Sequence, residues 1–516
     1  MDEEVLKFCM EKGFLLDKET FKLLEGFDRD SALTIAEKFS LLNEKLITKS
    51  FIINNVEKLS QTINEKKLIE KIKISFGVSV EISKIENISV INEQNAAIRD
   101  YGNLKVISSP VHLSKKIGVS DFVKHFRNRY MEIKKILQNR KEISNLISIN
   151  KINSSRQNIF IIGCILNKRL SKNKNFFFEV EDLTGQISVI ITKDKPELYE
   201  KAKNIIVDDI IAIKGVGSRE IAYANEIFYP DSFLHEKNIL DREESIAFIS
   251  DIHVGSNNFL EEKFLKFIRW LNGNEGDERQ KQESKKIKYL FITGDCVDGV
   301  GVFPGQEALL NIKDVKEQYN QLVAYLSKIR KDIKIVICPG QHDAVRIAEP
   351  QPAIGKVYGE ALYEMENVIL VSNPSLIEIA SQTKRGIRIL IYHGASMNSF
   401  VDEIESLRLE KAHERPSKVV KEILKRRHLA PIHASVTYIP NGKEDYLVIK
   451  DVPDIINTAD FHRPDVDVYN NTLIICSSCW QSITPFEEKV GNIPEPCKVP
   501  ILNLKTREIK IMDFSE

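Results

Sequence analysis

The sequence predicts a multidomain protein in which a helical N-terminal module and a small β-barrel precede a layered α/β domain. Three observations lead to this prediction. At 516 residues the chain is too long for one ordinary core. Apolar residues recur with helical spacing near the N-terminus and alternate with polar ones in the middle of the chain. Further on, short apolar runs alternate with helix-like stretches, which is typical of layered α/β domains.

The composition indicates a protein of the cytoplasm. Lys plus Arg and Asp plus Glu both total 74, so a basic surface for a nucleic acid must be local. The seven Cys are odd in number and scattered, which argues against a disulfide framework and favours a reducing cytosol. The acidic start, MDEEVLKFCMEKG, is unlike a signal peptide, and no apolar run reaches the ~18–20 residues of a membrane span. We therefore expect no membrane partner.

The first 150 residues divide into two parts. In residues 1–75 apolar side chains recur at three- and four-residue steps, as in Val5 and Phe8, with Glu and Lys between them. This spacing predicts a helical N-terminal module. Residues 76–150 are less patterned, and we expect a linker with some helix around 120–142.

Residues 151–238 change to a period of two, which is typical of β-strands. Five short strands are separated by turn-forming residues such as Leu-Thr-Gly at 183–185. We expect a small barrel, with an OB-fold as the leading interpretation. Three consecutive Phe at 176–178 lie on one strand. Either two of them point inward as core, because side chains alternate on a strand, or they form a stacking face for bases.

Residues 239–516 alternate strand-like apolar runs with helix-like stretches at 259–271, 310–330 and 404–428. This alternation predicts the α/β domain. A polar and charged insert at 272–288 interrupts the pattern, and we expect it to be a surface loop.

Polar motifs follow the apolar runs of this last domain. The runs SIAFIS, YLFIT, IKIVIC and IRILIY each end at or just before an acid or imidazole, and the motif Asp-Phe-His comes later. Because a buried strand delivers the residues after it to the carboxyl edge of a sheet, these side chains should gather there. The residues concerned are Asp251, His253, Asp295, Gln341, His342, His393, Asp460 and His462.

Clustered carboxylates and imidazoles indicate a metal-dependent phosphoesterase. Phosphodiester hydrolysis at neutral pH needs a strong nucleophile and neutralised phosphoryl oxygens, and two cations about 3.5–4 Å apart supply both. Mixed oxygen and imidazole donors suit Mn²⁺ or a related transition ion. Asp251, His253 and Asp295 together are hard to explain as packing, because Asp is rarely placed beside apolar strands without a partner.

The motifs, taken as a set, resemble those of the calcineurin-like metallophosphoesterases: D-x-H, G-D-x-x-D, G-N-H-D, a lone His and G-H-x-H. The resemblance implies a calcineurin-like phosphoesterase domain over residues 239–516. It implies two cations, the first held by Asp251, His253, His462 and a bridging Asp295, and the second by Asp295, Gln341, His393 and Asp460.

The same resemblance implies roles for two residues that are not ligands. His342 would contact the scissile phosphate or protonate the leaving oxygen. Asp298 would hold the His342 ring in one tautomer, as orienting carboxylates do in other sites.

Two positions depart from the family pattern. Gln341 stands where the family has Asn, and Asp460 stands where it has the first His of G-H-x-H. The additional methylene of Gln moves its carbonyl oxygen by on the order of 1 Å, whereas metal–ligand distances tolerate about 0.2 Å. Both changes fall on the second cation. We therefore expect one ion to be held well and the other loosely, with a low rate of hydrolysis.

The sequence segments around the motifs indicate a narrower family than the metal-ligand motifs do. Segments DCVDGVGVFPGQ, HDAVRIAEPQP and LKRRHLAP, and the pair Trp480-Gln481, resemble the small subunit of archaeal family D DNA polymerase, also called DNA polymerase II. The resemblance covers residues 155–516. It implies a heterodimer with the large catalytic subunit and a 3′→5′ exonuclease that proofreads on single-stranded DNA or primer 3′ ends. The polymerase complex itself would use Mg²⁺.

Alternatives to the exonuclease remain at this point. The chain could be a non-catalytic scaffold subunit that stabilises the polymerising subunit, or a stand-alone metallophosphatase. Eight basic residues in 404–428 form either a DNA-contacting face or a solvated helix face. A zinc site at Cys476-x-x-Cys479 is disfavoured because no second ligand pair lies nearby.

Overall fold

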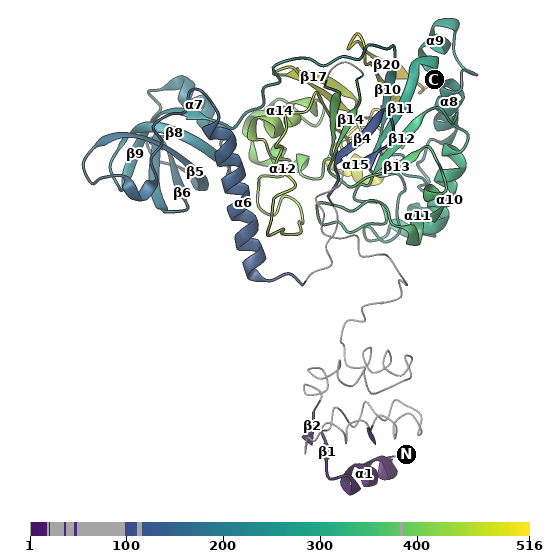
Figure 1. Ribbon diagram of the computed structural model, residues 1–516, viewed down its shortest axis with the longest axis horizontal. Helices are drawn as coiled ribbons and strands as arrows, with labels where there is room; N and C mark the ends of the chain where they lie inside the picture. The colour runs from purple at the N-terminus through teal and green to yellow at the C-terminus, as the bar shows by residue number, and fades with distance from the viewer. Residues whose placement is uncertain are drawn as a thin grey trace. The chain divides into compact units, whose positions relative to one another are not determined.

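A computed structural model of the chain describes residues 2–17, 20, 36–37, 46–48, 99–110, 116–381 and 385–516. The chain divides into two compact units, residues 1–94 and 95–516 (Figure 1). In the first unit, helix α1 (Asp2–Glu11) precedes strand β1 (Leu15–Leu16), which pairs in parallel with β2 (Leu46–Ile47). Residues 20 and 36–37 are also helical, whereas most of the remaining predicted helical module, and the expected linker up to residue 98, lie outside the described residues.

Part of the expected linker is a piece of sheet. Strand β3 (Arg99–Asp100) pairs with β4 (Leu104–Ser108), and β4 pairs antiparallel with a strand of the α/β domain. The linker prediction is wrong for these residues, because Leu104 and Val106 enter a hydrophobic core. Helix α6 (Val119–Gln138) forms close to the stretch in which a helix was expected.

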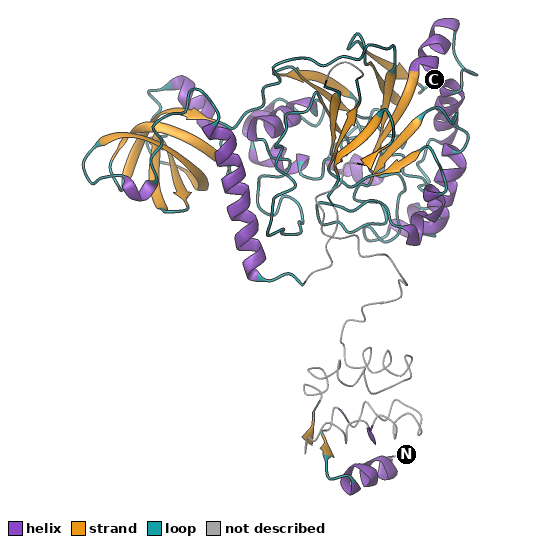
Figure 2. Ribbon diagram, viewed as in Figure 1, coloured by secondary structure: helices purple, strands orange, loops and turns teal. Residues whose placement is uncertain are grey.

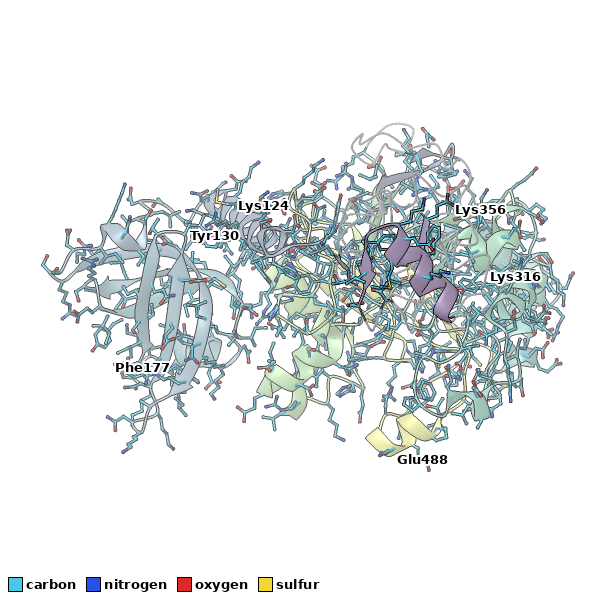
Figure 3. All side chains as sticks on the ribbon, turned by 90° about the horizontal axis from the view of Figure 1, so that it is seen from below. Lys124, Tyr130, Phe177, Lys316, Lys356 and Glu488 are labelled. Atoms are coloured by element: carbon cyan, nitrogen blue, oxygen red, sulfur yellow. The ribbon has the colours of Figure 1, made fainter. Side chains whose placement is uncertain are left out.

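Five strands form a closed barrel in the order β5-β6-β7-β9-β8, and β5 also pairs with β8 (Figure 2). The strands are β5 (Gln157–Leu170), β6 (Phe176–Asp182), β7 (Gly185–Ile191), β8 (Ile210–Gly217) and β9 (Ile221–Phe228), with helix α7 (Pro196–Lys203) between β7 and β8 and the short helix η1 (Ile149–Lys151) before β5. Phe176 and Phe178 lie in the barrel core. Phe177 is half-buried with the Arg169 guanidinium 5.0 Å from its ring centroid (Figure 3). The interpretation of two inward-facing Phe is confirmed.

Helix α6 packs on the outside of the barrel. Tyr130, Ile133 and Leu137 form a cluster with barrel residues such as Phe160 and Ile162, and the Tyr130 hydroxyl donates to the Ile162 carbonyl at 2.9 Å (Figure 3). The side chains of α6 therefore recur at helical spacing on the barrel surface, which fixes its C-terminal half there.

Two sheets form the α/β part. The six-stranded sheet has the order β13-β12-β11-β10-β19-β20 and the seven-stranded sheet has the order β17-β18-β16-β15-β14-β4-β3. The bounds are β10 (Ser245–Ile249), β11 (Ile287–Thr293), β12 (Lys334–Cys338), β13 (Val368–Leu370), β14 (Ser375–Ile379), β15 (Ile387–Ile391), β16 (Ile455–Thr458), β17 (Asp465–Tyr469), β18 (Thr472–Cys476), β19 (Lys498–Asn503) and β20 (Ile509–Asp513). Strands β10, β11, β12 and β13 run parallel, as do β15, β16 and β18.

The sheets face each other and helices cover their outer sides (Figure 2). Ile246 and Phe248 of β10 share a core with Ile389 of β15, whereas Ala247 and Ile249 pack toward helices. Each central strand is buried on both faces, which explains the near-continuous apolar runs of the sequence. The helices are α8 (Glu261–Leu271), α9 (Glu278–Lys286), α10 (Val315–Leu326), α11 (Lys356–Tyr363), α12 (Met397–Glu403), α13 (Glu405–Leu409), α14 (Ser417–Arg426), α15 (Pro485–Val490) and the short η2 (Gln306–Leu309).

The insert at 272–288 is not a loop throughout. It contains α9, whose N-cap Asp277 accepts from the Gln280 amide at 2.8 Å, while the Gln280 side chain accepts from the Asp277 amide at 2.9 Å. This reciprocal capping, followed by strong helix formers, stabilises a helix that has almost no apolar face. The loop prediction is therefore wrong here, since it relied on polarity alone.

Candidate metal centre

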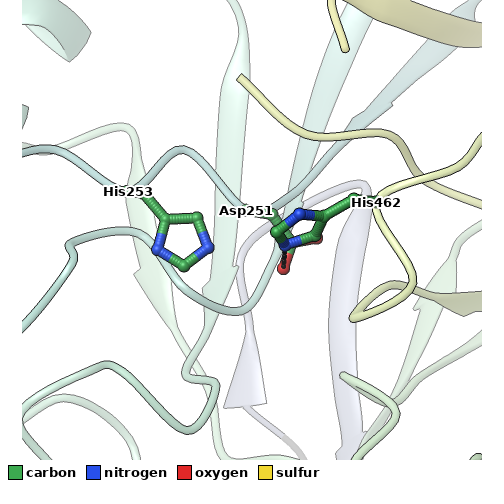
Figure 4. Close-up of side chains that lie close together, drawn as sticks. All are labelled: Asp251, His253 and His462. Atoms are coloured by element: carbon green, nitrogen blue, oxygen red, sulfur yellow. Dashed lines mark ion pairs between the residues drawn. The ribbon is translucent and has the colours of Figure 1, made fainter. Parts of the chain in front are cut away.

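The predicted ligands lie in loops that follow strands of both sheets. Asp251 and Asp295 follow β10 and β11 of the six-stranded sheet, whereas His393, Asp460 and His462 follow β15 and β16 of the seven-stranded sheet. In three groups, ligand atoms all lie within 4.8 Å of one another: Asp251 with His253 and His462 (Figure 4), Asp251 with Asp295 and His393, and His253 with Asp298 and His342. The edges of the two sheets thus bring together donors that are up to 211 residues apart in the chain.

Three imidazoles share one arrangement, with Nδ1 fixed from outside and Nε2 near the acids. His253 Nδ1 donates to the Asp298 carboxylate at 3.0 Å, His393 Nδ1 to the Thr293 carbonyl at 3.0 Å, and His462 Nδ1 to the Glu487 carboxylate at 2.7 Å. The Nε2 atom of His393 lies 3.2 Å from Asp295 Oδ2, and that of His462 lies 3.4 Å from Asp251 Oδ1. Such outer contacts fix the tautomer that offers Nε2 to a cation.

Buried polar atoms without hydrogen-bond partners mark the same place. Both carboxylate oxygens of Asp251 and the Nε2 atoms of His253 and His393 are buried and make no hydrogen bond. Leaving such groups unpaired is costly unless a ligand takes them up. Carboxylate and imidazole donors fit a divalent transition cation such as Mn²⁺, so the residues present suit the cations that the sequence implies.

Glycines bring the backbone close to these donors. A Cβ on Gly294 would lie 2.1 Å from His393 Nδ1, and a Cβ on Gly340 would lie 2.2 Å from Asp295 Oδ1. Any side chain at either position would displace a candidate ligand. These two glycines therefore set the tight packing around Asp295 and His393.

The backbone of the ligand loops adopts conformations that side chains disfavour. Five candidate ligands have left-handed φ angles: Asp251 at 47°, His253 at 52°, Asp295 at 48°, Asp460 at 71° and His462 at 57°. Left-handed backbone costs a residue with a side chain on the order of 1 kcal/mol, and it concentrates at functional sites. Because all five left-handed residues lie at the candidate metal centre, a functional reason for this backbone conformation is favoured over chance.

The charges at the centre are strongly coupled. Burial opposes ionisation of Asp251 and Asp295, but neighbouring histidines hold the pKa of each carboxyl below its usual range. Burial opposes protonation of His393 and His462. Asp295 nevertheless raises the pKa of the His393 ring, and Cys479 and Asp251 raise the pKa of the His462 ring, both well above the usual value. Because a cation must displace these protons, its binding should weaken as pH falls.

Asp298 plays a different part from the one expected. Its carboxylate accepts from His253, whereas His342 Nδ1 donates to the backbone carbonyl of Asp298 at 2.8 Å. The prediction that the Asp298 side chain orients His342 is therefore wrong in detail, since the carbonyl does so. Gln306, which the sequence did not single out, donates to the same carboxylate at 2.9 Å.

Of the two residues that depart from the family pattern, Asp460 lies beside His393, and Gln341 precedes His342 in the loop next to Asp295. Asp460 Oδ1 lies 3.7 Å from His393 Nε2, and burial raises the pKa of the Asp460 carboxyl. Gln341 is half-buried, and its neighbour His342 donates its amide to Asp295 Oδ1 at 2.8 Å. Gln341 thus belongs to the loop that contacts the bridging acid.

Glu487 is the functional residue that sequence reasoning missed. It lies in α15, where its Oε2 accepts from the Thr484 amide at 2.9 Å while its Oε1 accepts from His462. The Thr-Pro-Phe-Glu spacing is a capping-box signal that predicts the helix start. Nothing in that signal indicates contact with a histidine 25 residues earlier.

Two of the eight basic residues in the stretch at 404–428 are not part of a cationic surface. Arg426 and Arg427 are buried: Arg426 Nε pairs with Asp209 Oδ1 at 2.7 Å, and Arg427 Nε donates to the Ile449 carbonyl at 2.7 Å. Lys421 pairs with Asp467 at 2.5 Å. Both interpretations, a DNA face and a solvated face, are wrong for the two arginines.

No helix in the described part of the chain combines the length and apolar character that crossing a membrane requires. Among the described residues, Cys476 and Cys479 belong to no group of metal-ligand type, and both are free cysteines.

Fold and site together define a mixed α/β protein with a buried carboxylate–histidine centre between two sheets. The family of the B subunits of DNA polymerases alpha and epsilon matches residues 246–466. The chain is 38% identical to the DNA polymerase II small subunit of Methanothermobacter thermautotrophicus, over 81% of this chain and 84% of that protein. It is 36% identical to that of Pyrococcus furiosus, over 84% and 72%. It therefore belongs to the family of DNA polymerase II small subunits.

One further small subunit and one solved structure are also similar to this chain. The small subunit of Archaeoglobus fulgidus is 35% identical, over 80% of this chain and 81% of that protein. A solved structure of an archaeal phosphodiesterase, 14% identical, covers 52% of this chain and 98% of its own, with a TM-score of 0.26. That score is too low to define the fold.

Proposed function

We propose that this chain is the small subunit of a heterodimeric DNA polymerase and removes 3′-terminal nucleotides by two-metal phosphodiester hydrolysis. Family membership supports the subunit role. The observation that carries the hydrolytic role is the convergence of three histidine Nε2 atoms on buried acids. The Asp251 carboxylate oxygens and the Nε2 atoms of His253 and His393 make no hydrogen bond. The partner is a large catalytic subunit, and the substrate is single-stranded DNA or a primer 3′ end.

The donors divide between two cations. The first would be held by Asp251, His253 and His462, the second by Gln341, His393 and Asp460, and Asp295 would be a ligand of both. When bound, the pair would neutralise phosphoryl oxygens and lower the pKa of a water that attacks phosphorus. The proposal includes the fold: the barrel is an OB-fold, and the α/β part is a calcineurin-like phosphoesterase domain. The closure of the barrel supports the first assignment and the two facing sheets support the second.

His342 acts on the leaving oxygen. Because its Nδ1 donates to the Asp298 carbonyl, its Nε2 is the atom available to the substrate. In the protonated ring Nε2 can give its proton to the leaving oxygen, which leaves the ring neutral with its remaining proton on Nδ1. The Asp295 carboxylate, which receives the His342 amide, fixes the backbone of this residue beside the shared ligand.

Hydrolysis is tested on 3′-labelled single-stranded DNA with Mn²⁺. The parent chain should release the label. Asp295→Ala, which removes a ligand, and His342→Ala, which removes a general acid, should each lower the rate at least about 100-fold. The matched control is His235→Ala, an exposed histidine away from the centre, which should cleave like the parent. Equal rates in all four proteins would instead favour a scaffold subunit. Turnover of a small phosphomonoester without DNA cleavage would favour a metallophosphatase.

Unequal cation sites are part of the proposal. Gln341 and Asp460 both fall on the second cation, so Mn²⁺ titration by calorimetry should resolve one tight and one weaker site. Gln341→Asn, which restores the family residue, should tighten the weaker site and raise the rate. Two equal, tight sites in the parent chain would refute this asymmetry.

A further inference from the structure

The loop after Asp298 runs against His342. Gly299 and Gly301 have left-handed φ angles of 73° and 75°. A Cβ on Gly299 would lie 2.4 Å from the His342 carbonyl oxygen, so this approach requires glycine. The loop therefore lies directly beside the residue assigned to the leaving oxygen.

Two buried glutamines fasten this loop. Gln306 Nε2 donates to the Asp298 carbonyl and carboxylate at 2.8 and 2.9 Å, and Gln306 Oε1 accepts from the Val302 amide at 2.9 Å. Gln318 accepts from the Gly299 amide at 2.9 Å and donates to its carbonyl at 3.1 Å. Because Asp298 also bonds His253 and His342, the loop keeps a defined position relative to the candidate metal centre.

The loop carries an exposed aromatic ring beside His342. Phe303 is 38% exposed, and its ring centroid lies 6.4 Å from that of His342 with the planes at 65°. The neighbouring Val302 is 37% exposed. The loop thus holds the ring in place and leaves more than a third of this residue open to solvent. The ring presents an apolar face where a substrate would lie.

We propose that Phe303 is a nucleobase subsite, whose ring stacks on the base of the nucleotide whose phosphodiester lies at His342. This inference rests on the proposed function and specifies its substrate as an unpaired DNA end. Every base offers a π-face, so an aromatic ring binds bases with little sequence preference. A paired base must first leave its stack, so the subsite favours frayed or mismatched ends over paired ones.

A thermodynamic cycle isolates the stacking contact. The affinity of the full chain for a single-stranded oligonucleotide is measured by fluorescence anisotropy without divalent cations, so that nothing is cleaved. One oligonucleotide has an intact 3′-terminal nucleotide, and the other has a terminal nucleotide without its base. Phe303→Leu keeps an apolar side chain but removes the π-face. It should weaken binding of the intact end about 10-fold or more and leave the abasic end unchanged.

Two further variants complete the cycle. Phe303→Trp should retain the affinity for the intact end, and the neighbouring Val302→Ala should leave both affinities unchanged. The melting temperature of each variant shows that it folds. Phe303→Leu affinities that fall equally for both ends, or do not fall at all, overturn the subsite, as does a parent chain that binds neither oligonucleotide.

The hydrolytic role is read separately, from release of the terminal nucleotide with Mn²⁺. If the parent releases none while the cycle still couples Phe303 to the base, hydrolysis fails and the subsite stands. If the parent cleaves and the cycle shows no coupling, the subsite fails and hydrolysis stands.

Discussion

Glu487 connects helix α15 to the candidate metal centre through one side chain. One carboxylate oxygen accepts from Thr484 at the start of the helix, and the other accepts from His462 Nδ1 at 2.7 Å. Burial opposes ionisation, but the bond from His462 lowers the pKa of Glu487 overall. The charged carboxylate therefore both orients the His462 ring and strengthens it as a ligand.

Replacing Glu487 should weaken cation binding without removing a ligand. Glu487→Gln removes the charge that orients His462, and outer-shell changes of this kind cost about 10–100-fold in metal affinity. Mn²⁺ affinity measured by calorimetry is the readout. Glu488→Gln, on the exposed side of the same helix (Figure 3), should bind like the parent. Equal affinities in the two variants would show that the His462–Glu487 bond is only structural.

Glu349 is a buried carboxyl with a pH-dependent contribution to stability. Burial raises its pKa to about 8, and the Tyr392 hydroxyl donates to it at 3.2 Å. The folded chain therefore keeps a proton that the unfolded chain releases at a lower pH. The resulting stability is complete below the unfolded pKa of about 4.3, and it is lost as pH rises through about 8.

The free energy of unfolding should thus fall with pH in a way that depends on Glu349. Between pH 5 and pH 8 this carboxyl should contribute a decline of about 1 kcal/mol per pH unit. Glu349→Gln cannot ionise, so its denaturation curves should lack that share of the decline, whereas exposed Glu364→Gln should keep it. Identical pH slopes in Glu349→Gln and the parent would contradict the raised pKa.

At the scale of elements, helix α14 is tied to the barrel by a buried ion pair. Arg426 Nε lies 2.7 Å from Asp209 Oδ1, and both side chains are buried. Arg426 also donates to the Asn204 carbonyl at 2.6 Å, just after helix α7. Burial alone would favour neutral Asp209, so the carboxylate depends on this guanidinium.

Removing the guanidinium should loosen the barrel from α14. Arg426→Met leaves Asp209 buried and unpaired, which costs about 3–5 kcal/mol for a broken buried pair. Urea unfolding measures the change. Lys418→Met, which removes a partly exposed pair with Glu410, should cost no more than about 1 kcal/mol. A similar cost for both variants would mean that the buried pair has no special weight.

The elements were predictable where both faces of a strand are buried. Strands β10, β11, β12 and β15 appear in the sequence as continuous apolar runs, so their positions could be read directly. The position of strand β4 could not be read from the sequence, because only alternate residues such as Leu104 and Val106 enter the core. Its partner β14 also lies some 270 residues later in the chain. Helix α9 was missed because its signal is a cap and not an apolar stripe.

The same limit applies to the site. Its donors could be named from the sequence, since each follows an apolar run, and the three groups that the structure brings together contain only predicted residues such as Asp251 and His393. Their contacts could not be predicted in the same way. The sequence does not indicate which acid accepts a hydrogen bond from which imidazole. The bonds of His253 to Asp298 and of His462 to Glu487 depend on tertiary distances that no local pattern encodes.

At the scale of the whole molecule, the centre joins the two sheets. Asp251 and Asp295 come from one sheet and His393, Asp460 and His462 from the other. A bound cation would therefore link the sheets directly, and the folded chain would gain stability that grows with the logarithm of the cation concentration above its dissociation constant.

Mn²⁺ should raise the melting temperature of the chain, and EDTA should reverse the effect. A ligand at 100 times its dissociation constant adds about 2.7 kcal/mol to the folded state. Asp251→Asn should lose this shift in differential scanning calorimetry, and exposed Asp402→Asn should retain it. A shift that persists in Asp251→Asn would place the ion elsewhere.

The left-handed backbone at five ligand positions has an evolutionary consequence. Glycine at any of them would relieve local strain of about 1 kcal/mol while deleting a donor. Decay of the centre would therefore meet little thermodynamic resistance, and only selection for its chemistry would oppose drift toward an inert descendant with the same architecture.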